Sequence, residues 1–350
     1  MEKLPSGTTE LKSLTFSALR KKDHALLDHN LVAQRPRLLT GEYYKTPIES
    51  LGGMDCLPLE LLHAVLLILD LRTLTDFRYV NRRAKEVTGS MPQYRAVSTH
   101  ARTALTGILK IETGRWITCE TLYKKLCTAK CEKCGDFGGY LYLLTCKRVC
   151  FLCFSNDRKY LPLLVSEAVR KFGLQEGIGE TLPQMISLPG IYSHEDLESH
   201  QRYILTDYES ACLAGIAFHG SASAMRQHVA NDVGALELPE DIKTLSETIA
   251  EGSRFSTVRV GWPQIDDPFD DLDGKGNPFR YMATVRTPWL NTASQDSQEP
   301  QELEWGFHCV GCHNAYPYEP ADWRRIFNVE SFIAHLTERG RIIDGQHWLD

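Results

Sequence analysis

The arrangement of cysteines between residues 127 and 153 constrains the fold of this chain more than any other feature. Six of the eleven cysteines lie there, and four of them form two C-x-x-C pairs, Cys131 with Cys134 and Cys150 with Cys153. A two-residue spacer lets one tight turn present two sulfurs to the same ion, and zinc takes four such ligands at tetrahedral corners. The pairs therefore predict one zinc site.

The fifteen residues between these pairs predict how the site is built. Gly135, Gly138 and Gly139 precede an aromatic, β-favouring run from Tyr140 to Thr145, which indicates one strand of a hairpin. A knuckle, a hairpin and a second knuckle are typical of a zinc ribbon or treble clef. Four thiolates close the coordination shell and leave no open position for water, so we expect the zinc to be structural.

Other interpretations of these cysteines stay open at this point. Cys127 or Cys146 could replace one of the four cysteines of the C-x-x-C pairs as a ligand. Alternatively, all of these cysteines could be buried thiols that bind no metal. Disulfides are disfavoured, because residues 1–13 lack the apolar core of a secretory signal and reducing thiols inside a cell keep disulfides from persisting. We therefore expect an intracellular protein, and the apolar run from Ala64 to Leu69 is too short to cross a bilayer.

A further C-x-x-C pair, Cys309 with Cys312, predicts a second zinc site near the C-terminus. A helix is predicted from about Val329 to Glu338, with Asn328 as its cap and His335 beside its apolar face. A cysteine knuckle followed by a helix that carries histidine is the plan of a Cys-Cys-His-His finger. The fourth ligand is not fixed by the spacing, and the candidates are histidines 308, 313 and 347.

The segment from Met54 to Arg95 is unusually rich in leucine and predicts three short helices. Pro58 suits a first helical position, and apolar residues then recur at three- and four-residue steps as far as Leu69. Thr73 predicts the start of a second helix, and a third is expected to stop at Gly89. Three helices in about 40 residues cannot bury this much leucine among themselves, so we expect a partner to cover the excess.

The order of residues in this segment resembles the F-box motif. It begins with Leu-Pro-x-Glu-Leu-Leu, continues with Leu-Asp-Leu-Arg-Thr-Leu, and ends with Phe-Arg-x-Val-x-Arg-Arg. The resemblance implies a three-helix unit that docks on the Skp adaptor of a Skp-cullin-F-box ubiquitin ligase. It assigns adaptor contact to nine residues: Leu57, Pro58, Leu61, Leu62, Leu66, Leu69, Leu74, Phe77 and Val80.

The resemblance is not complete, and a second interpretation of the leucines exists. Where the family often has Cys and Trp in its third helix, this chain has Asn81 and Ala84, so one large anchor is missing. The leucines could instead pack on the rest of the same chain, since a leucine stripe is usually part of a core.

The order of all these motifs resembles a group of fungal F-box proteins that carry cysteine-rich segments after the F-box. We predict an α+β fold, with a three-helix F-box followed by a zinc-stapled α+β region. The expected units are an N-terminal extension (1–53), the F-box (54–100), a zinc-ribbon or treble-clef-like module (101–173), a middle α+β region (174–303) and a C-terminal Cys-Cys-His module (304–350).

The function predicted from these motifs is that of a non-enzymatic substrate receptor, which binds a Skp adaptor in a cullin ligase and recruits an unknown protein. A stand-alone RING-like ligase would need eight interleaved ligands, which the spacing does not supply. A zinc-dependent nucleic-acid-binding or transcription factor is disfavoured by the net charge of -6. We thus expect neither nucleic-acid nor membrane binding.

Two weaker patterns are set aside. Cys212, His219 and His228 suggest a nucleophile with a base, but no motif orients them, so we predict no catalytic residue. The second pattern, the acidic run from Asp266 to Asn277, lacks the ligand positions of a Ca²⁺-binding loop. Separately, the polar segment from Thr292 to Glu302 is interpreted as a linker.

Overall fold

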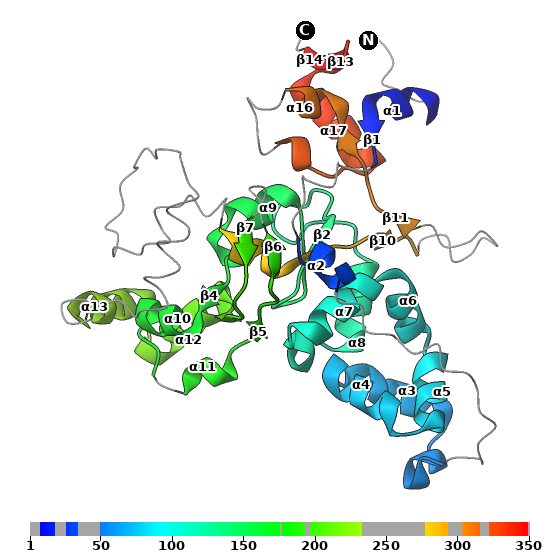
Figure 1. Cartoon of the computed structure of the whole chain (residues 1–350), viewed down its shortest axis with the longest axis vertical. Helices are drawn as coiled ribbons and strands as arrows, with labels where there is room; N and C mark the ends of the chain where they lie inside the picture. Colours follow the sequence, from blue (N-terminus) through cyan, green and yellow to red (C-terminus); the bar gives the residue numbers. More distant parts are fainter. Residues whose placement is uncertain are drawn as a thin grey trace.

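The fold is mixed α and β in the computed structural model, as predicted (Figure 1). The structure describes residues 8–17, 26–33, 50–175, 177–192, 197–232, 277–292, 303–315 and 322–348. Most of the predicted acidic run and of the predicted linker, residues 266–276 and 293–302, lie outside these ranges. Figure 1 shows the leucine-rich helices at one end of the molecule and both chain termini at the other.

The leucine-rich segment forms three helices, as predicted, but their limits differ from the prediction. They are α3 (Leu59–Ile68), α4 (Leu71–Val80) and α5 (Arg82–Ser90). Helix α4 begins earlier than Thr73, because the Asp70 carboxylate accepts a hydrogen bond from the Thr73 backbone N–H and so caps the first turn. Helix α5 passes through Gly89 without ending there.

Further helices continue directly from this segment and join it to the rest of the chain. They are α6 (Pro92–His100), α7 (Arg102–Lys110), the 3₁₀ turn η3 (Thr113–Trp116) and α8 (Cys119–Leu126). Another 3₁₀ turn, η2 (Gly52–Cys56), lies just before α3. Leu62, Leu66 and Leu74 lie in the same buried cluster as Leu122 of α8 and Cys131 of the first knuckle. The predicted F-box and the cysteine-rich module therefore share one core.

The hairpin predicted between the two cysteine pairs is confirmed. Strand β2 (Tyr140–Tyr142) pairs antiparallel with β3 (Lys147–Val149), and the helix α9 (Phe151–Asn156) follows the second knuckle. A third strand, β9 (Thr284–Arg286), completes this sheet in the order β3-β2-β9. Short-range patterns did not predict β9, because its partner strand lies more than a hundred residues earlier in the chain.

A fully buried arginine holds this sheet to its neighbours. Arg148 of β3 donates hydrogen bonds to the backbone carbonyls of Gly138, Lys125, Pro288 and Thr287, at 2.6, 2.9, 3.0 and 3.1 Å. Burial lowers the pKa of its guanidinium to about 10. One side chain thus ties the hairpin to the end of α8 and to the residues after β9.

The middle of the chain forms a second small sheet with helices beside it. Its strands follow the order β4-β8-β5, and the helix predicted from Ser166 to Phe172 is confirmed as α10 (Val165–Phe172), which ends at Gly173 in the left-handed conformation (φ 59°). The other elements of this region are η4 (Arg158–Tyr160), β4 (Leu163–Leu164), α11 (Ile178–Thr181), β5 (Gln184–Ile186), β6 (Gly190–Tyr192), β7 (Leu197–Ser199), β8 (Ile204–Thr206), α12 (Tyr208–His219), α13 (Ala222–Asp232) and α15 (Pro278–Met282).

The described N-terminal segments pack against two different parts of the fold. Helix α2 (Leu27–Ala33) buries Leu27 and Leu31 in the main core, and Asn30 holds the backbone of Ile191 through two hydrogen bonds of 2.9 and 3.1 Å. Helix α1 (Thr8–Leu14) and strand β1 (Thr15–Phe16) lie instead against the C-terminal module (Figure 1). The described parts of the predicted N-terminal extension therefore contact two different regions of the chain.

The C-terminal module is a small unit with its own buried cluster. It contains β12 (His308–Cys309), α16 (Val310–Asn314), η6 (Asp322–Arg324), α17 (Val329–Arg339), β13 (Arg341–Ile343) and β14 (Gln346–Trp348), and is reached through β10 (Trp289–Leu290) and β11 (Leu303–Glu304). Helix α17 and its Asn328 cap are as predicted, and Ser331 completes a capping box. Arg325 anchors the module to the first knuckle through an ion pair with Asp136 at 2.9 Å.

Candidate metal centres and an exposed apolar helix face

The two C-x-x-C pairs of the first cysteine-rich region come together in one cluster of four sulfurs, as their spacing predicted. The ligand atoms of Cys131, Cys134, Cys150 and Cys153 all lie within 4.8 Å of one another. In the first turn, Gly135 adopts φ 80° and its N–H bonds the Cys131 carbonyl at 2.9 Å, a conformation that favours glycine. In the second, Cys150 caps helix α9, so Cys153 points to the same side.

The spacing of these sulfurs fits a tetrahedral ion. The Cys134 and Cys150 sulfurs are 3.6 Å apart. Zn–S bonds of about 2.3 Å separate two tetrahedral ligands by about 3.8 Å, whereas a disulfide would bring the sulfurs to about 2.05 Å. The four cysteines could therefore hold one metal ion, with a sulfur at each corner of a tetrahedron.

The thiols of the cluster shift one another's pKa values. The Cys150 and Cys153 thiols donate to the Cys131 sulfur and hold its pKa far below the ordinary value. The same contact with Cys131 raises the pKa of Cys150 and raises that of Cys153 to about 12. A divalent cation bound among these sulfurs would favour the thiolate form of all four.

The structure separates the two alternative cysteines from this cluster. Cys146 is buried, and burial raises the pKa of its thiol to about 12. Burial also raises the pKa of the Cys127 thiol, which lies beside Tyr123. Among the described residues, the first cluster consists of the four cysteines of the C-x-x-C pairs, and neither Cys127 nor Cys146 belongs to it.

The second cluster contains Cys309, Cys312 and His335, as predicted, and its fourth member is His347. The Nε2 atom of His347 lies 3.3 Å from the Cys309 sulfur and 3.5 Å from that of Cys312, and the Nε2 atom of His335 lies 3.3 Å from the Cys312 sulfur. A tetrahedral zinc with bonds of about 2.3 Å to sulfur and about 2.0 Å to nitrogen would place these atoms about 3.5 Å apart.

The second cluster is assembled by three elements. The knuckle is the start of α16, His335 lies on α17, and His347 lies on β14 of the terminal hairpin. His347 faces the Gly340 carbonyl through Nδ1 at 3.1 Å, which fixes the tautomer that leaves Nε2 free for a metal. Hydrogen bonding to Cys309 raises the pKa of the His347 imidazole. The hairpin was not predicted, and it selects this histidine from the three candidates.

The two other candidate histidines lie outside the cluster. His308 precedes Cys309 and is fully buried, with Nδ1 2.9 Å from the Arg325 carbonyl. His313 follows Cys312 and lies edge-on to Trp323, with 6.1 Å between the ring centroids. These two histidines flank the knuckle cysteines in the sequence. The aromatic packing around the two histidines supports the outer side of the knuckle.

The nine residues assigned to adaptor contact divide between core and surface. Leu62, Leu66 and Leu74 are 2, 0 and 0% exposed, so their assignment to a partner surface is wrong, because the chain already covers them. Leu69 and Phe77 are half-buried. The remaining four are exposed, namely Leu57, Pro58, Leu61 and Val80.

Helix α3 nevertheless keeps an apolar face on the surface. Leu61, Val65 and Ile68 are 56, 43 and 67% exposed and follow one another at four- and three-residue steps, so they share one side of the helix. Leu57, just before the helix, is also exposed. We call Leu57, Leu61, Val65 and Ile68 the α3 face. The F-box resemblance assigned residues on both sides of this helix to adaptor contact, and of these Leu57 and Leu61 lie on the exposed side whereas Leu62 and Leu66 are buried.

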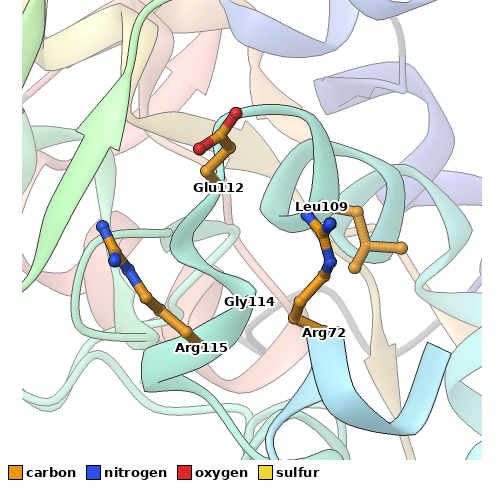
Figure 2. Close-up of a pocket in the computed structure, with 5 residues that line it drawn as sticks. All are labelled: Arg72, Leu109, Glu112, Gly114 and Arg115. Carbon is orange, nitrogen blue, oxygen red and sulfur yellow. The ribbon is translucent and has the colours of Figure 1, made fainter. Parts of the chain in front are cut away.

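A small pocket lies where α4 meets the turn after α7. It has a volume of about 140 Å³ and is lined by Arg72, Leu109, Glu112, Gly114 and Arg115 (Figure 2). Ligand pockets usually occupy about 300–1,000 Å³, so this one is smaller than a typical ligand pocket. Glu112 lines it with φ 66° and is the residue directly before the 3₁₀ turn η3.

The weak nucleophile pattern is not strengthened by the structure. Cys212 lies on α12, half-buried, and burial raises the pKa of its thiol. An activated cysteine nucleophile shows the opposite shift. His219 faces the Gly173 carbonyl through Nε2 at 2.9 Å and lies with its ring centroid 4.6 Å from that of His228.

No protein-family model, curated protein or solved structure matches this chain. The resemblance to F-box proteins therefore depends on the residues named above. No helix in the described parts of the chain combines the length and the apolar character needed to cross a bilayer.

Proposed function

We propose that this protein is a non-enzymatic F-box substrate receptor, which binds a Skp-type adaptor of a cullin ubiquitin ligase and presents a protein target to it. The observation that carries the proposal is the α3 face, an exposed apolar stripe on a helix whose other side is fully packed. Clustered apolar side chains on a protein surface usually mark a binding site.

The packing of the three helices supports this function. Leu62 and Leu66 anchor α3 in the core shared with the first metal centre, so the α3 face is presented from a fixed position. A preformed surface loses little conformational entropy on binding. The order of the Leu-Pro start, the Leu-Asp-Leu-Arg centre and the Val-x-Arg end adds the resemblance to the F-box.

The two metal centres have a structural role in this proposal. We expect zinc at both, because the Cys₄ and Cys₂His₂ donor sets match its preferred ligands and leave no coordination position open. They would stabilise the modules that lie beyond the F-box helices. The target of the receptor and the surface that recognises it are not specified by these features.

The test is a binding measurement between the zinc-loaded full chain and a purified Skp-type adaptor. The informative variant carries Leu61→Asp and Ile68→Asp, since both side chains are exposed and their replacement leaves the core intact. Leu62 is unsuitable, because a charge at a buried position would unfold the helix. Loss of two central apolar contacts should weaken binding by roughly 100-fold or more.

A matched control separates this surface from a general effect of charge. Leu213 on α12 is 60% exposed, so Leu213→Asp makes the same chemical change on another helix. It should bind the adaptor as tightly as the wild type does. Equal affinity of the wild type and the α3-face variant, or no binding by the wild type, would contradict the proposal.

A further inference from the structure

The N-terminal segment Thr8–Phe16 lies directly on the C-terminal metal centre, although almost three hundred residues separate them in the sequence. Strand β1 pairs antiparallel with β12, and the paired residues are Thr15 with Cys309 and Phe16 with His308. Figure 1 shows α1 and β1 beside α16 and α17, at the end of the molecule opposite to α3. The segment therefore makes backbone contact with a strand that carries a candidate ligand.

The ring of Phe16 contacts both histidines that flank the knuckle. It stacks on His308 with 5.3 Å between centroids and an interplanar angle of 28°. It meets His313 edge-on at 5.1 Å and 75°. Because His308 precedes Cys309 and His313 follows Cys312, a single side chain supports the outer side of the knuckle at both of its ends.

Apolar side chains of α1 complete this contact. Leu11 and Leu14 pack against the buried cluster of the module, which includes Cys309, Cys312 and Phe332. The Thr15 hydroxyl donates to the Leu11 carbonyl at 2.7 Å and so joins the helix to the strand. The segment thus forms one wall of the module.

The terminal hairpin holds the knuckle from another direction. A methyl group at Gly311 would lie 2.7 Å from the His347 ring, and the Asn314 side chain donates to the Gly345 carbonyl at 3.0 Å. The short helix α16 therefore depends on two separate elements for its position. The hairpin supplies a ligand, and β1 supplies the backbone pairing of Cys309 and the support of its neighbours.

We propose that the segment Thr8–Phe16 is an outer part of the C-terminal metal centre, with Phe16 as a positioning residue, so that docking of this segment and binding of zinc strengthen each other. Residues that orient metal ligands commonly change metal affinity when they are replaced. Thermodynamic linkage makes the coupling reciprocal, so metal binding must tighten docking by the same factor. This inference does not depend on the proposed adaptor binding.

The first test measures metal affinity in the full chain with Phe16→Ala. Cobalt(II) and zinc are competed against a chelator, and the thiolate absorption of cobalt distinguishes the four-thiolate site from the two-thiolate site. We expect the affinity of the Cys₂His₂ site to fall by about tenfold or more, while that of the Cys₄ site stays unchanged. Lys12→Ala is the control, because Lys12 is an exposed residue of the same segment.

The second test measures the reverse effect by hydrogen exchange with Cys312→Ser, which removes one ligand of the second cluster. Amides of residues 8–16 should lose protection, whereas those of α2 should keep it, because α2 packs in the main core. An unchanged affinity of the second site in Phe16→Ala would overturn the inference. Unchanged amide protection of residues 8–16 in Cys312→Ser would overturn it as well, and so would the finding that the wild-type chain binds one metal ion instead of two.

Discussion

Replacement of Arg148 by methionine is expected to destabilise the protein severely. The guanidinium donates to four backbone carbonyls and is fully buried, and methionine is an unbranched side chain without hydrogen-bond donors. The Lys125 carbonyl also accepts from the Thr128 N–H, so three carbonyls depend most on Arg148. A buried polar group that loses its partner costs about 1–3 kcal/mol.

The expected net effect is smaller than the sum of these losses. Three carbonyls give a gross cost of roughly 3–9 kcal/mol, and removal of a buried charge returns part of it, because a buried ion carries a desolvation penalty of several kcal/mol. We expect a net loss in the lower part of this range, about 3–5 kcal/mol, because the substituted side chain no longer carries a buried charge. For a domain of 150–250 residues this corresponds to a fall in Tm of roughly 6–20 °C.

The assay is thermal unfolding of the zinc-loaded protein, followed by circular dichroism. Arg82→Met is the control, because Arg82 has an exposed side chain and pairs with Glu86 on the surface of α5, where such pairs contribute little. Its Tm should change by no more than about 2 °C. If Arg148→Met lowered the Tm no more than Arg82→Met does, the assigned role of the buried guanidinium would be wrong.

Two further substitutions test the assignment of ligands by metal content per chain. Gly311→Ala should lower the content from two zinc ions to one, because the new methyl group would lie 2.7 Å from the His347 ring, whereas Gly89→Ala, with open space at its Cβ, should retain two. Two retained ions in Gly311→Ala would contradict the role of His347. Cys127→Ser and Cys146→Ser should each retain two ions, since neither thiol belongs to a cluster, and loss of an ion in either variant would return that cysteine to the ligand set.

The sequence predicted the features that depend on short spacings. The C-x-x-C pairs form the first cluster, and the hairpin between them follows from β-favouring residues bounded by glycine. His335 was predicted because a capped helix with one apolar face places it toward the core. His347 could not be selected, because its position depends on the hairpin that folds β14 back onto α16, and nearby histidines offer the same chemistry.

The features that the sequence did not predict are long-range pairings and buried charges. Strand β9 pairs with β2, and β1 pairs with β12, across separations that no local pattern encodes. Arginine side chains are mostly exposed in proteins, yet Arg148 and Arg280 are each buried where backbone carbonyls converge on them. Such sites exist only after the chain is folded, since their acceptors come from distant segments.

Helix α3 shows why the direction of an apolar face must come from the structure. Its apolar residues form two stripes along the helix. One contains Leu62 and Leu66, the other contains Leu61, Val65 and Ile68, and the sequence allows either one to be buried. The shared core fixes the first stripe, because Leu62 and Leu66 contact the same buried cluster as the first knuckle. Loss of zinc from the Cys₄ site would therefore loosen the support of α3, so the affinity for an adaptor should decrease on chelation even though the α3 face contains no metal ligand. Unchanged adaptor affinity in a chelated protein whose first site is empty would show that α3 is positioned independently of that module.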